Sequence, residues 1–112
     1  MERKSKMAKK QTAGRDNLGE FAPKFAELND DVLFGEVWSR EAELSAHQRS
    51  LITISALISA GSFEQLPAHL KIGKSNGITK DEISEVITHL AFYVGWPKAW
   101  SAFGIAKEVF GN

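Results

Sequence analysis

The chain has 112 residues, 43% of them hydrophobic, and its fourteen basic side chains are balanced by fourteen acidic ones. This length predicts a single domain with a buried core, and the zero net charge gives no reason to expect nucleic acid or an anionic membrane as the main partner. The absence of cysteine excludes disulfides, thiolate metal sites and thiol redox chemistry. With no signal peptide and no apolar run of about 18 residues, we expect a cytoplasmic protein without a membrane span.

The beginning of the chain is strongly basic, with Glu2 as the single acid before Asp16. We interpret residues 1–16 as a mobile basic arm and residues 17–112 as the folded domain. Such a run suits a contact with nucleic acid or an anionic surface, and it also suits a solubilising tail. The tail is favoured, because runs of like charge are usually solvated. The basic residues are Arg3, Lys4, Lys6, Lys9, Lys10 and Arg15.

A helical pattern begins at Asn17. Apolar residues three and four positions apart share one helix face, and Pro23 fits the first turn of a helix. The cluster from Asn29 to Asp31 is typical of a helix cap, so we expect a second short helix or a kink from Val32 to Trp38. The region therefore predicts an N-terminal helical hairpin, whose apolar face comprises Leu18, Phe21, Phe25 and Leu28.

The stretch from Leu51 to Ala60 is apolar almost all the way round a helix. Ser45 with Gln48 forms a capping box at its start, and Gly61 ends it. A helix of this kind must be covered on several sides, yet it is too short to cross a bilayer. We therefore expect neighbouring subunits to cover part of it.

Three further helices follow. One starts at Ser62 or at Pro67 and ends at Asn76 and Gly77. Thr79 and Glu82 form a capping box for the next, which ends at Gly95, and Pro97 opens a final helix that closes at Gly111. No segment alternates like a strand, so the predicted class is all-α, with about five to six helices.

His69 and His89 are the candidate acid–base residues, because histidine normally titrates near neutral pH. Glu85 and Tyr93 share the helix face of His89; a carboxylate would raise the histidine pKa, and a tyrosine hydroxyl could orient a substrate oxygen. The alternatives are a partly exposed His69 and a His89 that packs against another subunit. We interpret His47, among polar neighbours in a first helical turn, as a surface residue.

Metal and cofactor signatures are absent from the sequence. The histidines lack the spacing of a zinc site, and the glycines form no phosphate-binding loop, so we expect no metal and no cofactor.

An aromatic group surrounds the turn at Gly95, formed by Phe92, Trp96, Trp100 and Phe103. It suits a pocket wall, but a core or interface anchor is favoured, because aromatic side chains dominate the energetics of both.

Several ordered segments resemble the carboxymuconolactone decarboxylase family. The resemblance covers roughly Phe25 to Phe110, including the N-terminal run from Phe25 to Gly35. Its segments are Arg49-Ser50-Leu51-Ile52-Thr53-Ile54, Ala56-Leu57, His69-Leu70, Asn76-Gly77-Ile78-Thr79, Glu82-Ile83 and His89-Leu90-Ala91-Phe92-Tyr93-Val94-Gly95-Trp96-Pro97. The resemblance implies the helical fold of alkyl hydroperoxidase D-like proteins, assembled as trimers or as hexamers made of two trimers.

The resemblance also shows where this chain departs from its thiol-using relatives. Laying the histidine of their Cys-x-x-Cys-x-x-x-His motif on His69 puts the two cysteine positions at Ser62 and Gln65. The acid that relatives carry near the start of the apolar helix has no counterpart at Gln48 or Ser50. A thiol peroxidase mechanism is therefore rejected, and we expect no dithiol-dependent consumption of peroxide.

The leading hypothesis is a cofactor-free, lyase-type decarboxylase acting on a small organic acid or lactone in a pocket near a subunit interface. His69 and His89 would be its acid–base residues. Arg49 would hold the substrate carboxylate, although a surface salt bridge suits it equally. Tyr93 and Trp96 would contact the substrate. The alternative is a non-catalytic oligomeric member of the superfamily that kept the scaffold and lost the thiol site.

Overall fold

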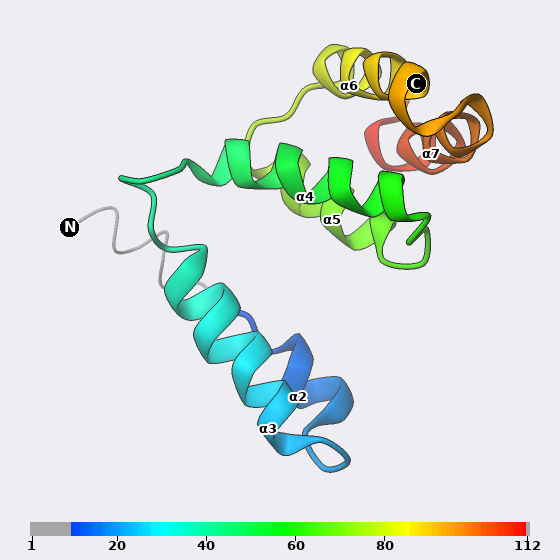
Figure 1. Cartoon of the computed structure of the whole chain (residues 1–112). Helices are drawn as coiled ribbons and strands as arrows, with labels where there is room; N and C mark the ends of the chain where they lie inside the picture. Colours follow the sequence, from blue (N-terminus) through cyan, green and yellow to red (C-terminus); the bar gives the residue numbers. More distant parts are fainter. Residues whose placement is uncertain (1–9, 112) are drawn as a thin grey trace. The chain divides into compact units, whose positions relative to one another are not determined.

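The computed structural model describes residues 10–111, which form six α-helices and one π-helix and contain no strand (Figure 1). This confirms the predicted all-α class. The described chain divides into two compact units, one ending at Ser45 and the other beginning at Ala46. The helices are α2 (Ala13–Leu18), α3 (Pro23–Glu27), η1 (Leu28–Val37), α4 (Ala46–Ala60), α5 (Leu66–Ser75), α6 (Lys80–Val94) and α7 (Trp96–Phe110).

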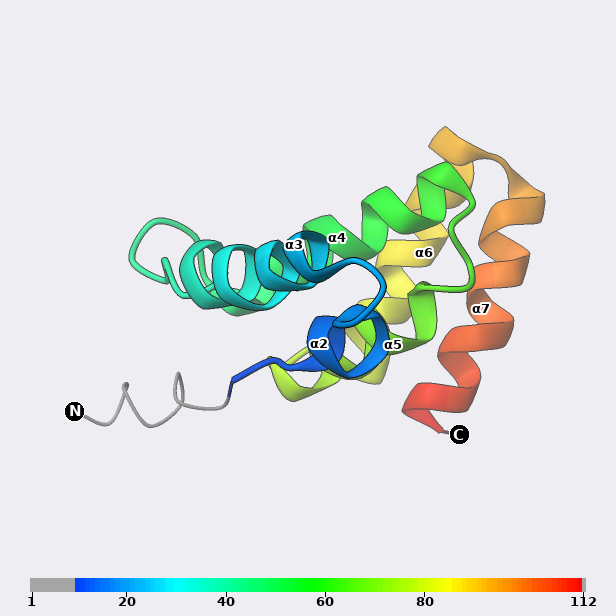
Figure 2. The same ribbon diagram turned by 90° about the horizontal axis from the view of Figure 1, so that it is seen from below.

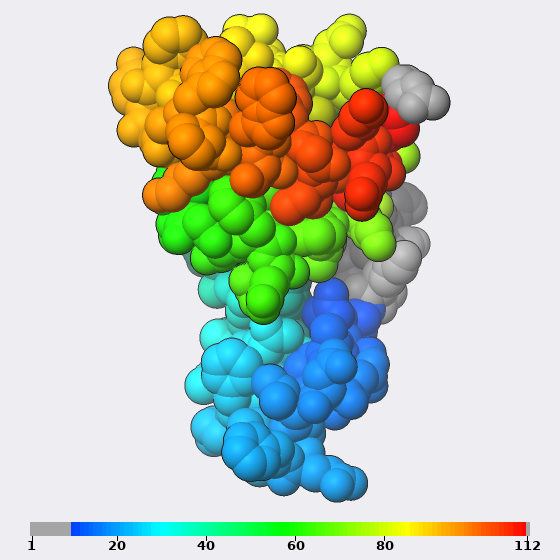
Figure 3. Space-filling view, turned by 90° about the vertical axis from the view of Figure 1, so that its right-hand side faces the viewer, coloured from blue at the N-terminus to red at the C-terminus, as the bar shows by residue number. Residues whose placement is uncertain are grey.

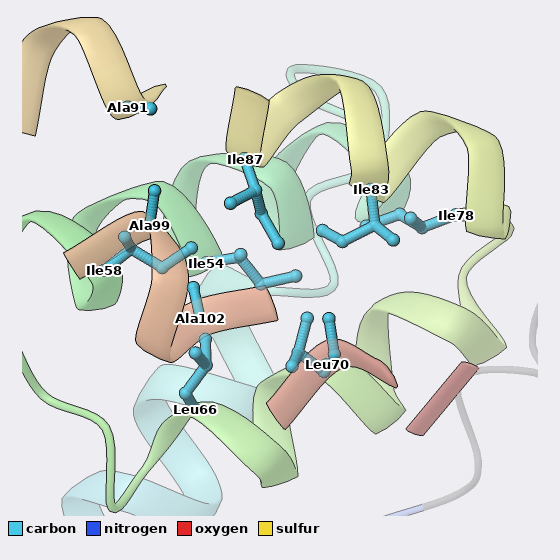
Figure 4. Close-up of a cluster of buried hydrophobic side chains, with 11 residues drawn as sticks. Ile54, Ile58, Leu66, Leu70, Ile78, Ile83, Ile87, Ala91, Ala99 and Ala102 are labelled. Carbon is cyan, nitrogen blue, oxygen red and sulfur yellow. The ribbon is translucent and has the colours of Figure 1, made fainter. Parts of the chain in front are cut away.

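Helix α4 is the centre of the second unit, and α5, α6 and α7 all pack against it. Its fully buried Ile54 and Ile58 join the core drawn in Figure 4. Ile52, in contrast, stays 57% exposed. The chain therefore covers one side of this apolar helix. The other core residues are Leu66, Leu70, Ile78, Ile83, Ile87, Ala91, Ala99, Ala102 and Ala106.

Capping residues, glycine and proline determine where the helices of this unit begin and end. The Thr79 hydroxyl accepts a hydrogen bond from the Glu82 amide at 3.1 Å, which confirms the predicted start of α6. Gly95, at a φ of 106°, ends α6 and turns the chain into α7, so that the two helices form a hairpin (Figure 2). Helix α5 begins at Leu66, with Pro67 in its first turn, rather than at Ser62.

Two lysines stabilise helix C-termini in the same unit. Lys98 donates to the carbonyl of Ser59, near the end of α4, at 2.9 Å. Lys74 donates to the carbonyl of Val109, near the end of α7, at 3.1 Å. Because the last carbonyls of a helix lack partners within it and carry its negative dipole end, an ammonium group is favoured there.

Asp30 organises the first unit. Its side chain has no exposed surface, and its carboxylate accepts hydrogen bonds from the amides of Gly14 and Arg15 at 2.8 and 3.0 Å. The Asn29 side chain donates to it at 2.9 Å, while Arg15 binds Asp31 through both guanidinium ends. Burial alone would raise the pKa of Asp30, but the hydrogen bonds from Asn29, Arg15 and Gly14 hold it below its usual value.

The helix boundaries in the first unit differ from those predicted. The cluster from Asn29 to Asp31 was expected to cap the helix after it, but α3 runs directly into η1, and Asp30 instead binds the N-terminus of α2. The helical pattern from Asn17 is divided between α2 and α3, and Pro23 begins α3, which confirms its predicted place in a first helical turn. Ala13 to Asp16 of the predicted arm belong to α2, whereas residues 1–9 lie outside the described residues.

The apolar face predicted for the first unit is exposed. Phe21 is 90% exposed and Phe25 60% exposed. The buried residues of its three helices are Gly14, Ala26 and Asp30. Polar contacts around Asp30, rather than an apolar core, therefore hold these helices together.

We predict that Asp30→Asn loosens α2 more than Asp31→Asn does. The first change removes a buried charge that accepts several hydrogen bonds, and the second removes an exposed partner of Arg15. Hydrogen exchange of the α2 amides measures the difference. Because the pKa of Asp30 is lowered by folding, its stabilisation is present above about pH 3.9 and is lost as the pH falls through the folded-state pKa. Equal exchange rates in both variants would contradict the role of Asp30.

Candidate functional site

His69 lies in the first half of α5, between two fully buried core leucines, Leu66 and Leu70, on neighbouring turns. The residue is half-buried, and its Nδ1 atom is buried. Burial lowers the pKa of His69, because the charged imidazolium loses hydration there. At neutral pH the ring is therefore uncharged and keeps one N–H donor and one acceptor nitrogen.

Arg49 lies in the first turns of α4, where it is half-buried with its Nε atom out of solvent. Helices α4 and α5 pack directly against each other. The fold therefore puts Arg49 and His69 on adjoining helices. A guanidinium and a neutral imidazole are complementary in chemistry: one is a fixed cation that binds carboxylate, and the other exchanges a proton.

His89 and Tyr93 form a pair on α6. Their rings lie 5.0 Å apart, centroid to centroid, and Tyr93 is 76% exposed. The pair lies on a different side of α6 from the buried Ile83 and Ile87, about 120° around the helix. Among the described residues, no Cα atom of α5 lies within 8 Å of a Cα atom of α6, so the backbones that carry His69 and His89 do not adjoin. Glu85 is exposed on the same face and forms no ion pair with His89 within residues 10–111.

The aromatic group around Gly95 lies on the surface. Phe92 and Trp96 meet edge to face, with ring centroids 6.1 Å apart. Trp96 is 57% exposed and Trp100 73% exposed. Within one chain these rings form neither the core nor the wall of an enclosed cavity.

His47 has a partner that the sequence analysis missed. Its Nε2 atom lies 2.7 Å from Glu82 Oε1, linking the first turn of α4 to the first turn of α6. Both side chains are about one third exposed. No local spacing could have revealed this pair, because its members are 35 residues apart. The sequence indicated Glu82 as a capping residue, but its side chain contacts His47 instead.

A pocket of about 550 Å³ lies between α5 and α7, away from His69. Lys71 and Glu108 give it charges of both signs, and Lys74 is held by the Val109 carbonyl. Two helix C-termini meet here, so the dipoles oppose an anion. This pocket is not the predicted acid site. Its lining residues are Pro67, Lys71, Lys74, Ser75, Ile105, Glu108 and Val109.

Ser62 and Gln65, the positions that the resemblance assigns to the cysteines of thiol-using relatives, form a turn. The Gln65 amide donates to the Ser62 carbonyl at 3.3 Å, immediately before α5 begins. Neither side chain can carry out disulfide chemistry. Residues 10–111 contain no group of three or more His, Cys, Asp or Glu side chains placed to hold a metal, and none of their helices has the length and apolarity to span a membrane.

Comparison with known proteins supports the resemblance. Residues 23–108 match the carboxymuconolactone decarboxylase family. Over 95 residues the chain is 41% identical to a 4-carboxymuconolactone decarboxylase of Acinetobacter baylyi, covering 85% of this chain and 70% of that protein. It is 31% identical over 86 residues to a nitrosuccinic acid decarboxylase of Metarhizium robertsii, covering 77% of this chain and 59% of that relative.

We predict that His69→Gln makes folding stability less dependent on pH below about 6.5, the ordinary histidine pKa. Because folding lowers the pKa of His69, the unfolded chain binds its proton first. Stability therefore falls as the pH drops below about 6.5 and stops falling below the folded-state pKa. Urea unfolding at a series of pH values measures this slope. His89→Gln, at an exposed histidine, is the matched control; the same slope in wild type and His69→Gln would refute the prediction.

Proposed function

Because the chain belongs to the carboxymuconolactone decarboxylase family, we propose that it is a cofactor-free decarboxylase of a small lactone acid or other small organic acid. The names of the two relatives support this proposal, since one names a lactone and the other an acid, and both are decarboxylases. The neutral, half-buried His69 is the observation in this chain that carries it.

The reaction needs few groups from the protein. In a lactone acid, the bond between carbon and carboxylate breaks, CO₂ leaves, and the electron pair moves into the conjugated carbonyl to form an enolate. A proton then returns to carbon. The electrons move within the substrate, so no external oxidant or reductant is required.

His69 and Arg49 suit the two charges of this reaction. A neutral imidazole can donate its N–H to the developing enolate oxygen, and the half-buried position strengthens such a hydrogen bond. We assign Arg49 to the substrate carboxylate, which its planar guanidinium can bind through both oxygens. The packing of α4 against α5, the helices that carry the two residues, supports this assignment.

We assign His89, Tyr93 and Trp96 to a second part of the site, as acid–base and substrate-contacting residues. They are exposed on one chain, so they need a wall from a neighbouring subunit. We therefore propose a homo-oligomer, a trimer or a hexamer of two trimers, located in the cytoplasm. The exposed Ile52 on α4 supports such an assembly, because a large apolar side chain there loses solvent on association.

The alternative is a non-catalytic oligomeric member of the family. Two observations favour it: His69 does not line the pocket between α5 and α7, and the acid and thiols of the relatives are missing from Ser50, Ser62 and Gln65. A protein of this kind would keep the assembly and bind no lactone acid.

We predict that purified protein releases CO₂ from at least one member of a panel of lactone acids and small organic acids. His69→Gln should lower kcat by about 10²–10⁴-fold, the usual contribution of an acid–base residue. Arg49→Lys should mainly raise KM, because it loses the two-pronged contact with carboxylate. His47→Gln, at the histidine bound to Glu82, is the matched control and should keep kcat.

The same panel separates the two functions. Binding of a lactone acid without turnover in wild type would exclude the decarboxylase and leave a binding protein. Unchanged kcat in His69→Gln would exclude His69 as the acid–base residue. Neither binding nor turnover across the panel would favour the non-catalytic alternative.

A further inference from the structure

The outer side of α7 carries a stripe of residues spaced four, three and four apart. We call it the α7 stripe; it consists of Trp96, Trp100, Phe103 and Lys107. In Figure 3, which looks onto α7 (orange to red), the side chains of this helix form the molecular surface along its length. The spacing is that of a helix seam that packs against another helix, because it keeps one line of side chains facing the partner. The core residues Ala99, Ala102 and Ala106 occupy a different side of α7.

The exposed area is large enough for a specific interface. Phe92, which contacts Trp96, extends the stripe onto α6 and is 77% exposed. At about 150–250 Å² for each aromatic side chain, the stripe and Phe92 expose on the order of 500 Å². Two such surfaces bury on the order of 1,000 Å² before flanking residues are counted, which is the lower limit for a specific interface. Exposed apolar patches of this size are usually contact sites.

The stripe is complementary to itself when two copies run antiparallel. With Trp100 of one copy opposite Phe103 of the other, Trp96 falls opposite Lys107 of the other copy. Both pairs then occur twice, as a two-fold contact requires. Lys107 is exposed and forms no ion pair within the part of the chain that the structure describes, so its ammonium group is available for the face of the partner's indole. The stripe contains no acid to oppose this pairing.

We propose that a second copy of this chain docks on the α7 stripe in this antiparallel arrangement. The docked copy also covers the solvent-exposed side of the His89–Tyr93 pair. Phe92 and Tyr93 are consecutive residues of α6, 77% and 76% exposed, that point about 100° apart around the helix, so a copy that covers Phe92 lies next to the exposed side of Tyr93. The docking is independent of the proposed function. The use of the covered His89–Tyr93 pair as part of a substrate site rests on the proposed function.

Sedimentation of the full chain over a range of concentrations tests the docking. Trp100→Glu and Lys107→Glu should each reduce the assembly to half its mass or less, with the association constant lowered at least about tenfold. Lys80→Glu, a charge reversal at an exposed lysine on α6, is the matched control and should leave the mass unchanged. Circular dichroism identifies any variant that fails to fold; Lys107→Glu changes an exposed residue and keeps the test decisive.

A second variant tests the register. Adding Trp96→Arg to Lys107→Glu should restore the assembly, because the new arginine meets the new glutamate of the other copy. The two positions are eleven residues apart on one helix, about 16 Å, so they cannot pair within a chain. A wild-type chain that stays monomeric, an assembly that persists in both Trp100→Glu and Lys107→Glu, or a double variant that is not restored would overturn the proposal.

The accessibility of Tyr93 shows whether the second copy covers the His89–Tyr93 pair, and it can be measured without substrate because Tyr93 is the single tyrosine of the chain. Nitration of Tyr93 by tetranitromethane should be at least about tenfold slower in the wild-type assembly than in Trp100→Glu. Equal rates would remove the pair from the interface. Because no activity is measured, failure here is distinguishable from failure of the proposed decarboxylase function.

Discussion

The packing of one side of α4 determines the rest of the second helical unit. Ile54 and Ile58 are fully buried there, and each contributes about 1.5–3 kcal/mol by leaving water. Gly73 of α5 allows the close approach that this packing needs: a Cβ at that position would lie 2.8 Å from Ile78 Cδ1 and 3.1 Å from Ile54 Cδ1. The neighbouring Ser50, also fully buried, accepts a hydrogen bond from Asn76 at 3.0 Å. These contacts fix where α5 lies on α4.

The same packing determines the chemistry of His69. Since Leu66 and Leu70 point into the core, the histidine between them lies at the edge of that core and loses part of its hydration. Its pKa falls because the charged imidazolium loses hydration there. The neutral state of the histidine on α5 is thus a consequence of how α5 packs against the apolar α4. The proposed site uses a property that the core creates.

Local signals in the sequence were sufficient for the elements they govern. Thr79 and Glu82 predicted the start of α6, because capping involves residues three positions apart. Residues joined by tertiary contacts escaped prediction. Asp30 binds amides sixteen and fifteen residues earlier in the chain, and its local appearance suggested the wrong helix.

The candidate site shows the same division. Histidine chemistry and the resemblance made His69 a candidate, and helix periodicity placed His89 and Tyr93 on one face. Neither indicated that the α5 and α6 backbones stay more than 8 Å apart within the described chain, because that depends on how both helices pack around α4. The lowered pKa of His69 was equally invisible, since it depends on burial by neighbouring helices.

The loss of the thiols fits the proposed chemistry. A peroxidase transfers electrons to its substrate, so it needs a pair of groups that can be oxidised and reduced again. A decarboxylase redistributes electrons within its substrate and needs a donor for one oxygen and a cation for the carboxylate. Ser62 and Gln65 share a backbone hydrogen bond in the turn before α5, and in the proposed reaction His69, one turn later, would supply the donor. Of the Cys-x-x-Cys-x-x-x-His motif, this chain retains the histidine, and the proposed reaction needs that residue and not the thiols.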